Sequence, residues 1–257
     1  FIVPFETVMA DIRAQVAAGA EHITFGDPDF LNGPGHALKL ARALHDEFPA
    51  LSFDFTTKVE HILQHRALMP EFRALGASFV ISAFESTSDN VLQKLHKGHT
   101  RADMDEALAI LEAARLPVQS TWLPFTPWTT LDDYIDMLAW IRERDLVAHV
   151  PAVQLSIRLL VPPNSVLLAD NPTGLFDHLD AANFSHAWNH PDPRMDELQA
   201  RVTVIAENAP ASSPRTAFSA IEQLAYGLAN RPVPAPQPGR PRRIRPTPPR
   251  LTEDWFC

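Results

Sequence analysis

Acidic residues follow the first apolar run that is typical of a β-strand. Residues 21–26, "EHITFG", lead into Asp27, Pro28 and Asp29. Gly26 lets a backbone approach a ligand closely, Pro28 stiffens the turn, and the two carboxylates offer hydrogen-bond acceptors. An ordinary Asx/Pro turn explains the same residues without a ligand, so both interpretations stand at this point.

Polar residues also follow the next two runs of this kind. Lys58 comes directly after "SFDFTT", and Ser82, Glu85 and Ser86 lie in or after "SFVISAF". A surface ion pair would explain Lys58, and a helix cap would explain Ser86. Neither explanation covers Glu85, which therefore favours a ligand site at this end of the strand.

Two further residues could contact a substrate. Trp122 begins the proline-stiffened segment "TWLPFTPWTT" and could form a flat apolar wall for a ring, although tryptophan more often packs in a core. Arg158 interrupts an apolar run and needs an anionic partner, which either a substrate carboxylate or an acidic side chain would supply.

Several kinds of chemistry find no motif in the chain. It contains no HExxH, GxSxG, Walker or GxGxxG pattern, its eleven histidines have no metal-ligand spacing, and Cys257 is its one cysteine. We therefore predict no metal site and no nucleophilic triad. A net charge of −9 argues against nucleic acid and anionic membranes as partners. The absence of a signal peptide, a long apolar run and a disulfide framework favours the cytoplasm.

Strand-like runs alternate with helical patterns along the chain. The expected strands are 21–26, 52–57, 78–84, 118–123 and 152–160. Thr100 and Thr130 are predicted N-caps of the two clearest helices, and Gly98 is expected at the left-handed position that ends another. The alternation predicts an α/β protein with a parallel sheet, either a doubly wound open sheet or a complete or partial (β/α) barrel. Both place ligands at the carboxyl ends of the strands.

Taken in order, these strand-end segments resemble the radical S-adenosylmethionine (AdoMet) family over roughly residues 1–170. "FGDPDF" is similar to the Gly-Gly-Glu-type segment of that family, with Gly-Asp in place of Gly-Glu. The resemblance implies that Gly26, Asp27 and Pro28 hold the AdoMet amino group. "LVPPNSVLL" resembles the "PPGSxLL" stretch that follows the sixth strand of the family's barrel.

A second segment extends the predicted AdoMet site. "FESTSDNVLQKLHKGHT" is similar to the family's "ES…VL…KGHT" phrase, which implies that Glu85 and Ser86 contact the ribose or methionyl part. Lys58 and Ser82 complete the predicted cofactor-binding set. The predicted substrate contacts are Asp29, Trp122 and Arg158.

The resemblance implies a partial parallel (β/α) barrel of the radical AdoMet type with its first strand missing, followed by C-terminal helices and a disordered Pro/Arg-rich tail. In that family three cysteines in a C-x3-C-x2-C loop hold a [4Fe-4S] cluster that binds AdoMet. One cysteine cannot ligate such a cluster. AdoMet is therefore the cofactor expected for this chain, and the cluster and an electron donor are expected only for the intact enzyme.

The carboxyl end resembles the subgroup named for its CUAEP or CCAEP tail. Residues 231–250 hold eight prolines, six arginines and no acidic residue, and "LTEDWFC" follows. In that subgroup a selenocysteine or a second cysteine follows the position of Cys257, so the resemblance implies a redox role for this thiol. A selenocysteine codon interpreted as a stop would then explain where the sequence ends. A chance terminal cysteine is the alternative.

We expect three parts: a partial barrel over 1–170, a helical extension over 171–230 and a linker and tail over 231–257. The favoured function is a fragment of an enzyme that makes a 5′-deoxyadenosyl radical from AdoMet and acts on an unknown small-molecule or peptide substrate. The chain by itself is expected to be inactive. The alternatives are a degenerate barrel that binds AdoMet or a protein without catalysis, and a metal-free lyase that uses acidic residues of the strand ends as acid and base.

Overall fold

A computed structural model describes residues 2–169, 174–209, 214–235 and 246–249. The chain divides into two compact units, each assembled from separate stretches of sequence. The first unit comprises Phe1–Phe84, Gly98–Thr121 and Ile244–Cys257, and the second comprises Glu85–Lys97 and Trp122–Arg243. The expected division near residues 170 and 230 stays a prediction, and residues 170–173 lie outside the described part.

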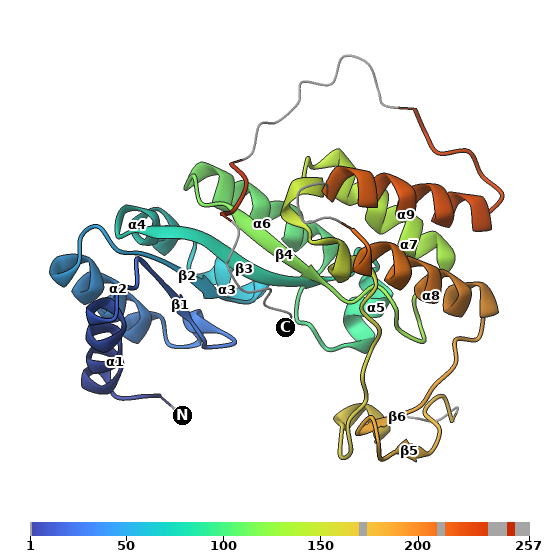
Figure 1. Ribbon diagram of the computed structural model, residues 1–257, viewed down its shortest axis with the longest axis horizontal. Coiled ribbons are helices and arrows are strands. Elements are labelled where there is room, and N and C mark those ends of the chain that lie inside the picture. Colours follow the sequence, from blue (N-terminus) through green and yellow to red (C-terminus); the bar gives the residue numbers. More distant parts are fainter. Residues whose placement is uncertain (1, 170–173, 210–213, 236–245, 250–257) are drawn as a thin grey trace. The chain divides into compact units, whose positions relative to one another are not determined.

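A four-stranded sheet forms the centre of the first unit. Its strands lie side by side in chain order (Figure 1): β1 (His22–Phe25), β2 (Ser52–Thr56), β3 (Ala77–Glu85) and β4 (Val118–Trp122). The pairings of β1 with β2 and of β2 with β3 are parallel. Sequential order is how a (β/α) barrel winds, whereas a doubly wound sheet reverses its order at a switch point. The structure is therefore consistent with the partial barrel.

Helices precede and connect these strands. They are α1 (Phe5–Ala17), α2 (Pro34–Glu47), α3 (Val59–Gln64), α4 (Met69–Ala74) and α6 (Arg101–Ala113), with short 3-10 turns η1 (Phe30–Asn32) and η2 (Arg66–Leu68). Thr100 caps α6 as expected, because its side chain accepts a hydrogen bond from the Asp103 backbone while the Asp103 side chain accepts one from the Thr100 backbone.

The second unit is largely helical. Its elements are α5 (Asp89–Lys94), α7 (Leu131–Glu143), α8 (Pro193–Glu207), α9 (Pro214–Leu228), the short strands β5 (Leu179–Asp180) and β6 (Ser185–His186), and the 3-10 turns η3 (Val147–His149), η4 (Ala152–Leu155) and η5 (Val166–Leu168). Thr130 caps α7 with the same reciprocal arrangement, here with Asp133. Helices α8 and α9 lie within 171–230, where the sequence predicted helices.

The fifth predicted strand, 152–160, is wrong. Its first half forms the 3-10 turn η4, which starts after Pro151, and Gln154 donates its backbone N–H to the Pro151 carbonyl. Only Arg158 makes a strand-like contact, a single parallel bridge to Phe125. A continuous apolar run indicates burial, but by itself it does not distinguish a buried strand from a buried turn.

The expected role of Gly98 as a helix end is also wrong. Helix α5 ends at Lys94, and His96 takes the left-handed conformation two residues later, with φ at 53°. Gly98 also has a positive φ, 70°, and a Cβ there would lie 3.2 Å from Glu60 Oε2. The backbone conformation favours glycine at this position, and the Glu60 side chain of α3 packs close to it.

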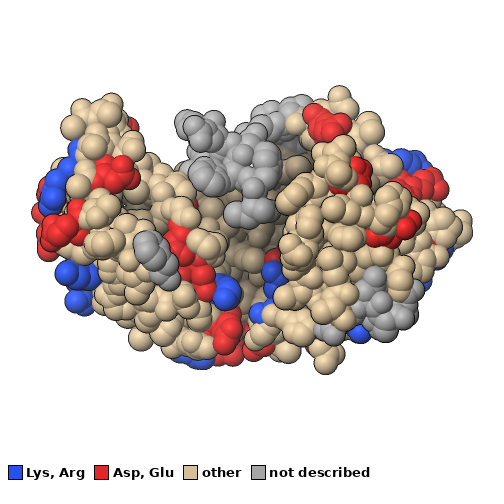
Figure 2. All heavy atoms as spheres, turned by 90° about the horizontal axis from the view of Figure 1, so that it is seen from below, with Lys and Arg blue, Asp and Glu red and all other residues tan. Residues whose placement is uncertain are grey.

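Residues 231–235 and 246–249 are the described parts of the predicted tail, and they contain no helix or strand. Cys257 lies outside the described residues. Within the described ranges no helix has the length and apolar character needed to cross a membrane. On the face drawn in Figure 2, Lys and Arg residues are interspersed with Asp and Glu residues.

Candidate functional site

The loop after β1 has an exposed tip and a buried anchor. Gly26, Asp27 and Pro28 are exposed, and Asp29 is buried. Asp29 donates its backbone N–H to Asp27 Oδ1 at 2.8 Å, which closes an Asx turn. Apart from the chain neighbours of Gly26, no described heavy atom lies within 4 Å of the place where a Cβ would stand. The tip therefore presents backbone to open space at the carboxyl end of a parallel strand.

Asp29 joins this loop to the segment that follows β2. Its Oδ1 accepts hydrogen bonds from Thr57 Oγ1 at 3.1 Å, from the Lys58 backbone N–H at 3.4 Å and from His61 Nδ1 at 2.9 Å. Its Oδ2 lies 3.3 Å from Lys58 Nζ, a distance that suits an ion pair, although no described group makes a hydrogen bond to this oxygen. Three hydrogen bonds and one ion pair thus fix the Asp29 carboxylate, which in turn fixes the exposed tip. The predicted contact between Asp29 and a substrate stays a prediction.

These partners determine the charge state of Asp29. Burial by itself would raise the pKa of the Asp29 carboxyl, but the hydrogen bond and charge of His61, together with Lys58 and Thr57, outweigh it and lower the pKa below 3.8. A carboxyl group whose pKa is lower in the folded state stabilises the fold above its unfolded pKa. That stabilisation is lost as the pH falls through the folded pKa.

We therefore expect Asp29→Asn to reduce stability most above about pH 5, by about 1–3 kcal/mol, because a charge-assisted network is lost. The difference from the wild type should shrink towards pH 3. Denaturant unfolding at several pH values measures it, and Asp46→Asn, at an exposed position of α2, is the matched control. A deficit that is independent of pH would contradict an ionised Asp29.

Ser82 lies in the middle of β3 and is fully buried. No described group makes a hydrogen bond to its Oγ. Side chains alternate along a strand, so Ser82 shares a face with Val80 and Phe84, both 0% exposed. The structure therefore places Ser82 on the apolar face of the sheet, and its predicted contact with AdoMet stays a prediction.

Glu85 ends β3 in an unusual backbone conformation. Its φ is 64°, a region that costs a non-glycine residue free energy and that recurs at functional sites. Its carboxylate forms an ion pair with Lys97 at 2.5 Å, and its carbonyl accepts a hydrogen bond from the Leu123 N–H. Ser86, buried beside it, accepts a hydrogen bond from the Ser88 N–H at 3.1 Å just before α5. The two predicted AdoMet contacts are thus neighbours at one strand end of the second unit.

Trp122 packs in the core of the second unit. It is 1% exposed, and its ring meets Trp140 of α7 edge to face, with 5.7 Å between the ring centroids. Its backbone N–H donates to Gln154 Oε1 at 2.9 Å. These contacts are those of a core tryptophan, and the substrate contact stays a prediction.

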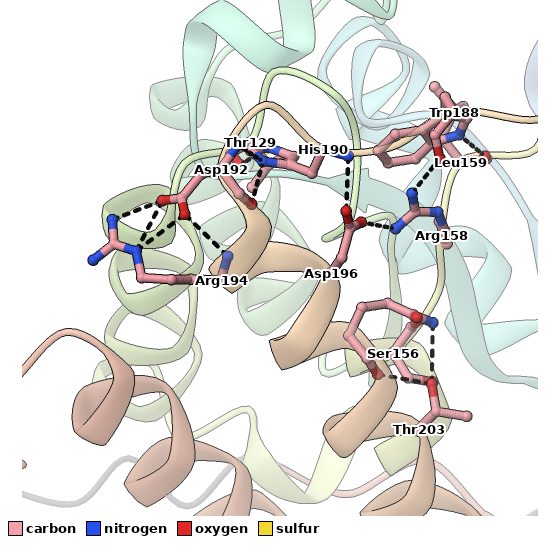
Figure 3. A network of polar contacts seen from close by, with 11 residues as sticks. Thr129, Ser156, Arg158, Leu159, Trp188, His190, Asp192, Arg194, Asp196 and Thr203 are labelled. Carbon is pink, nitrogen blue, oxygen red and sulfur yellow. Dashed lines mark hydrogen bonds and ion pairs between the residues drawn. The ribbon is translucent and has the colours of Figure 1, made fainter. Parts of the chain in front are cut away.

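Arg158 has protein partners on three sides (Figure 3). It donates to Asp196 Oδ1 at 2.8 Å and to the Trp188 carbonyl at 2.7 Å, and its Cζ lies 3.6 Å from the centroid of the Trp188 ring. The sequence predicted that this cation needs an anionic partner, and Asp196 of α8 supplies one. A substrate carboxylate would have to share the guanidinium with these groups, so that role stays a prediction.

His190 extends this network, and sequence reasoning missed it (Figure 3). Its backbone N–H donates to Asp196 Oδ2 at 3.0 Å, and its Nε2 lies 2.9 Å from the Thr129 carbonyl. Asp192 caps α8 through the Arg194 backbone N–H. The Asp-Pro pair that starts α8 was a readable signal for the cap, but the link to Arg158 spans 38 residues and has no local signature.

The predicted site residues belong to different units. Gly26, Asp27, Pro28 and Asp29 lie in the first unit together with Lys58, which contacts Asp29. Glu85, Ser86, Trp122 and Arg158 lie in the second unit. Within that unit Glu85 and Ser86 are adjacent, whereas Arg158 is bound to Trp188 and α8.

No group of three or more His, Cys, Asp or Glu residues in the described ranges could hold a metal ion. The one cysteine of the sequence, Cys257, is outside those ranges, and one thiolate cannot bind a [4Fe-4S] cluster. These residues do not fit the cluster.

No family model matches this chain, and no curated protein matches it. Comparison of structures does find similar proteins. The cobalamin-dependent AdoMet radical enzyme OxsB with aqua-cobalamin bound is similar over 88% of this chain and 42% of its own length, with a TM-score of 0.65 and 13% identity.

OxsB with both aqua-cobalamin and AdoMet bound gives a TM-score of 0.66 at the same identity. The radical AdoMet methyltransferase TsrM from Kitasatospora setae covers 55% of the chain at a TM-score of 0.46, too low to support an argument. The chain spans about two fifths of the length of OxsB. At this identity the similarity establishes the fold: the chain is folded like a part of a radical AdoMet enzyme.

Proposed function

We propose that this chain is the AdoMet-binding part of a radical AdoMet enzyme. The fold shared with OxsB over most of the chain carries the proposal, because a solved structure of OxsB contains AdoMet. The resemblance of the strand-end segments supports it independently. Within the proposal, the cofactor residues are Gly26, Asp27, Pro28, Lys58, Ser82, Glu85 and Ser86.

The loop after β1 offers the clearest physical support. An exposed glycine backbone at a strand's carboxyl end can approach a ligand closely, and the Asp29 network holds that backbone in place. Such preorganisation reduces the free energy that binding would otherwise spend on ordering the loop. We propose that the amino group of AdoMet binds at this tip, next to Asp27.

The reaction itself belongs to a larger protein in this proposal. The cluster that would cleave AdoMet requires ligands from outside the described residues, and the terminal Cys257 is proposed to act with a following selenocysteine or cysteine. The substrate, a small molecule or a peptide, would be held near Trp122 and Arg158. The subgroup with the CUAEP or CCAEP tail is the proposed assignment.

Calorimetric titration of the purified chain with AdoMet tests the proposal. We expect saturable binding, weakened at least about 10-fold by Gly26→Val, because the new side chain would fill the space that the backbone offers to the ligand. Stability should hardly change, since the added atoms meet no described neighbour within 4 Å and φ is not positive.

Gly35→Val in α2 is the matched control, because a Cβ at Gly35 also has no described heavy atom within 4 Å. This variant should bind AdoMet like the wild type. A wild-type chain that does not bind AdoMet, or a Gly26→Val variant that binds it equally well, would refute the proposal.

A further inference from the structure

The sheet of the first unit has two unlike faces. Phe53 and Phe55 of β2 lie on one face, and the Phe55 ring packs against Phe30 of η1 and Phe72 of α4, both outside the sheet. The register pairs His22 with Ser52 and Thr24 with Asp54 on the opposite face. A sheet covered on both faces by apolar layers would show nearly continuous apolar strands. The polar side chains on this second face therefore need another explanation.

Asp54 is the central group of that face. It is 0% exposed, and its Oδ1 accepts hydrogen bonds from His22 Nε2 and Thr24 Oγ1, each at 2.7 Å. Its Oδ2 has no hydrogen-bond partner in the described part of the chain. A buried carboxylate oxygen without a donor is costly, typically by 1–3 kcal/mol or more. One oxygen is thus fully engaged and the other is left for a donor that these residues do not supply.

His22 and Thr24 hold the Asp54 carboxylate in one orientation. The second ring nitrogen of His22, Nδ1, lies 2.7 Å from Ser52 Oγ, and the ring is parallel to that of Phe79 within 2°. The imidazole is therefore fixed on two edges. Because both donors engage the same oxygen, the geometry directs Oδ2 away from them as an acceptor.

Ser52, His22 and Asp54 also form the sequence of contacts seen in nucleophilic triads. Acyl transfer needs hydrogen-bond donors aimed at the developing oxyanion. Besides its contact with His22, Ser52 Oγ donates a hydrogen bond to the Glu21 carbonyl at 3.5 Å, and a carbonyl oxygen cannot donate to an oxyanion. This arrangement favours recognition by Asp54 over nucleophilic attack by Ser52.

We propose that Asp54 is a recognition residue for a small molecule that presents a primary ammonium group, with His22 and Thr24 as its positioning residues. An ammonium offers three donors and a charge opposite to that of the carboxylate, so it satisfies Oδ2 better than a neutral hydroxyl does. Insofar as this molecule is the substrate, the inference rests on the proposed function.

A ligand would reach Asp54 only after the side chains that cover it rotate. The carboxylate is covered in this structure, but His22, Thr24 and Thr56 around it are each partly exposed. Side-chain rotations at a binding surface are common when ligands bind. AdoMet also carries an amino group, which is proposed to bind at the Gly26 tip, so the experiment separates the two ligands.

Benzylamine serves as the probe, and benzyl alcohol and benzoate are its neutral and anionic matches. We expect wild-type protein to bind benzylamine at least about 10-fold more tightly than benzoate, as measured by NMR titration. In Asp54→Asn the ratio of the affinity for benzylamine to the affinity for benzoate should fall to about 1. The affinity for AdoMet should stay within about twofold of the wild-type value. Asp11→Asn, at an exposed position of α1, should leave both unchanged.

Wild-type protein provides a second test that needs no variant. Benzylamine should shift the backbone amide signals of Thr24 and Asp54 and the ring signals of His22. The inference would be overturned if wild-type protein bound benzylamine and benzoate equally well, or if these signals did not shift. It would also be overturned if folded Asp54→Asn kept the preference for benzylamine over benzoate. Ser52→Ala should keep the preference for benzylamine over benzoate. Loss of that preference in Ser52→Ala would favour the nucleophilic triad instead. Failure of AdoMet to bind would refute only the proposed function.

Discussion

Replacing Phe55 with alanine will lower the free energy of unfolding of the first unit by about 3–5 kcal/mol. Phe55 is 0% exposed, and its ring centroid lies 5.2 Å from that of Phe30 and 5.1 Å from that of Phe72. The substitution removes a whole ring from the layer that joins β2 to α4 and η1, and rigid neighbours refill such a cavity only in part.

Hydrogen exchange of the β2 amides at increasing urea concentration gives the unfolding midpoint of the first unit. The shift of this midpoint measures the loss of stability. Ile2→Ala is the control, because Ile2 is 64% exposed and its truncation should change stability by less than about 0.5 kcal/mol. If Phe55→Ala costs less than about 1 kcal/mol, the apolar face is not the packed face, and the assignment of the polar face to a ligand fails with it.

Replacing Trp188 with alanine should destabilise the second unit by a similar amount, about 3–5 kcal/mol. Trp188 is 7% exposed and packs with Leu159, Val161 and Phe176. Its indole N–H donates to the Leu159 carbonyl at 2.9 Å, and its ring covers the Arg158 guanidinium. The variant thus loses apolar burial, a buried hydrogen bond and a cation–π contact together.

Two further variants help to separate the contributions to this loss of stability. Trp188→Phe keeps an aromatic ring but loses the indole N–H, so it should cost about 1–3 kcal/mol for the unsatisfied Leu159 carbonyl. Phe184→Ala, at a position 68% exposed in the same unit, should be nearly neutral. Thermal unfolding of the three variants provides the comparison, and equal losses in Trp188→Phe and Trp188→Ala would show that ring packing contributes little.

Both substitutions also bear on the proposed function, because of where Phe55 and Trp188 lie in the fold. Phe55 keeps β2 in register, and β2 carries Asp54 and leads to the Thr57 hydroxyl that binds Asp29. Trp188 and Asp196 fix Arg158, so a variant that frees Arg158 changes the charge available to any substrate near it. A loss of stability must therefore be separated from a loss of binding at each position.

Local sequence was sufficient for the features that depend on neighbours along the chain. The first four strands, the N-caps Thr100 and Thr130, and helices within 171–230 were all predicted, because strand propensity, capping and proline act over a few residues. The order of strands along the chain also made a barrel-like fold one of two possibilities.

Local sequence failed where one pattern suits two structures. The apolar run 152–160 was compatible with a buried strand and with a buried turn, and Pro151 decided for the turn η4. Gly98 was compatible with a helix end and with close packing, and the neighbouring carboxylate of Glu60 showed that close packing applies. Neither decision was contained in the segment itself.

The sequence by itself therefore determined the first four strands and the capped helices, and that Asp27, Asp29 and Glu85 lie at or after the ends of strands. Only the tertiary structure decided which groups these and other polar side chains contact. Asp29 reaches His61 across 32 residues, Asp54 reaches His22 across 32, and Arg158 reaches Asp196 across 38. Such pairs depend on the register of the strands and on helix packing, which arise from the summed burial of many side chains and leave no local signature.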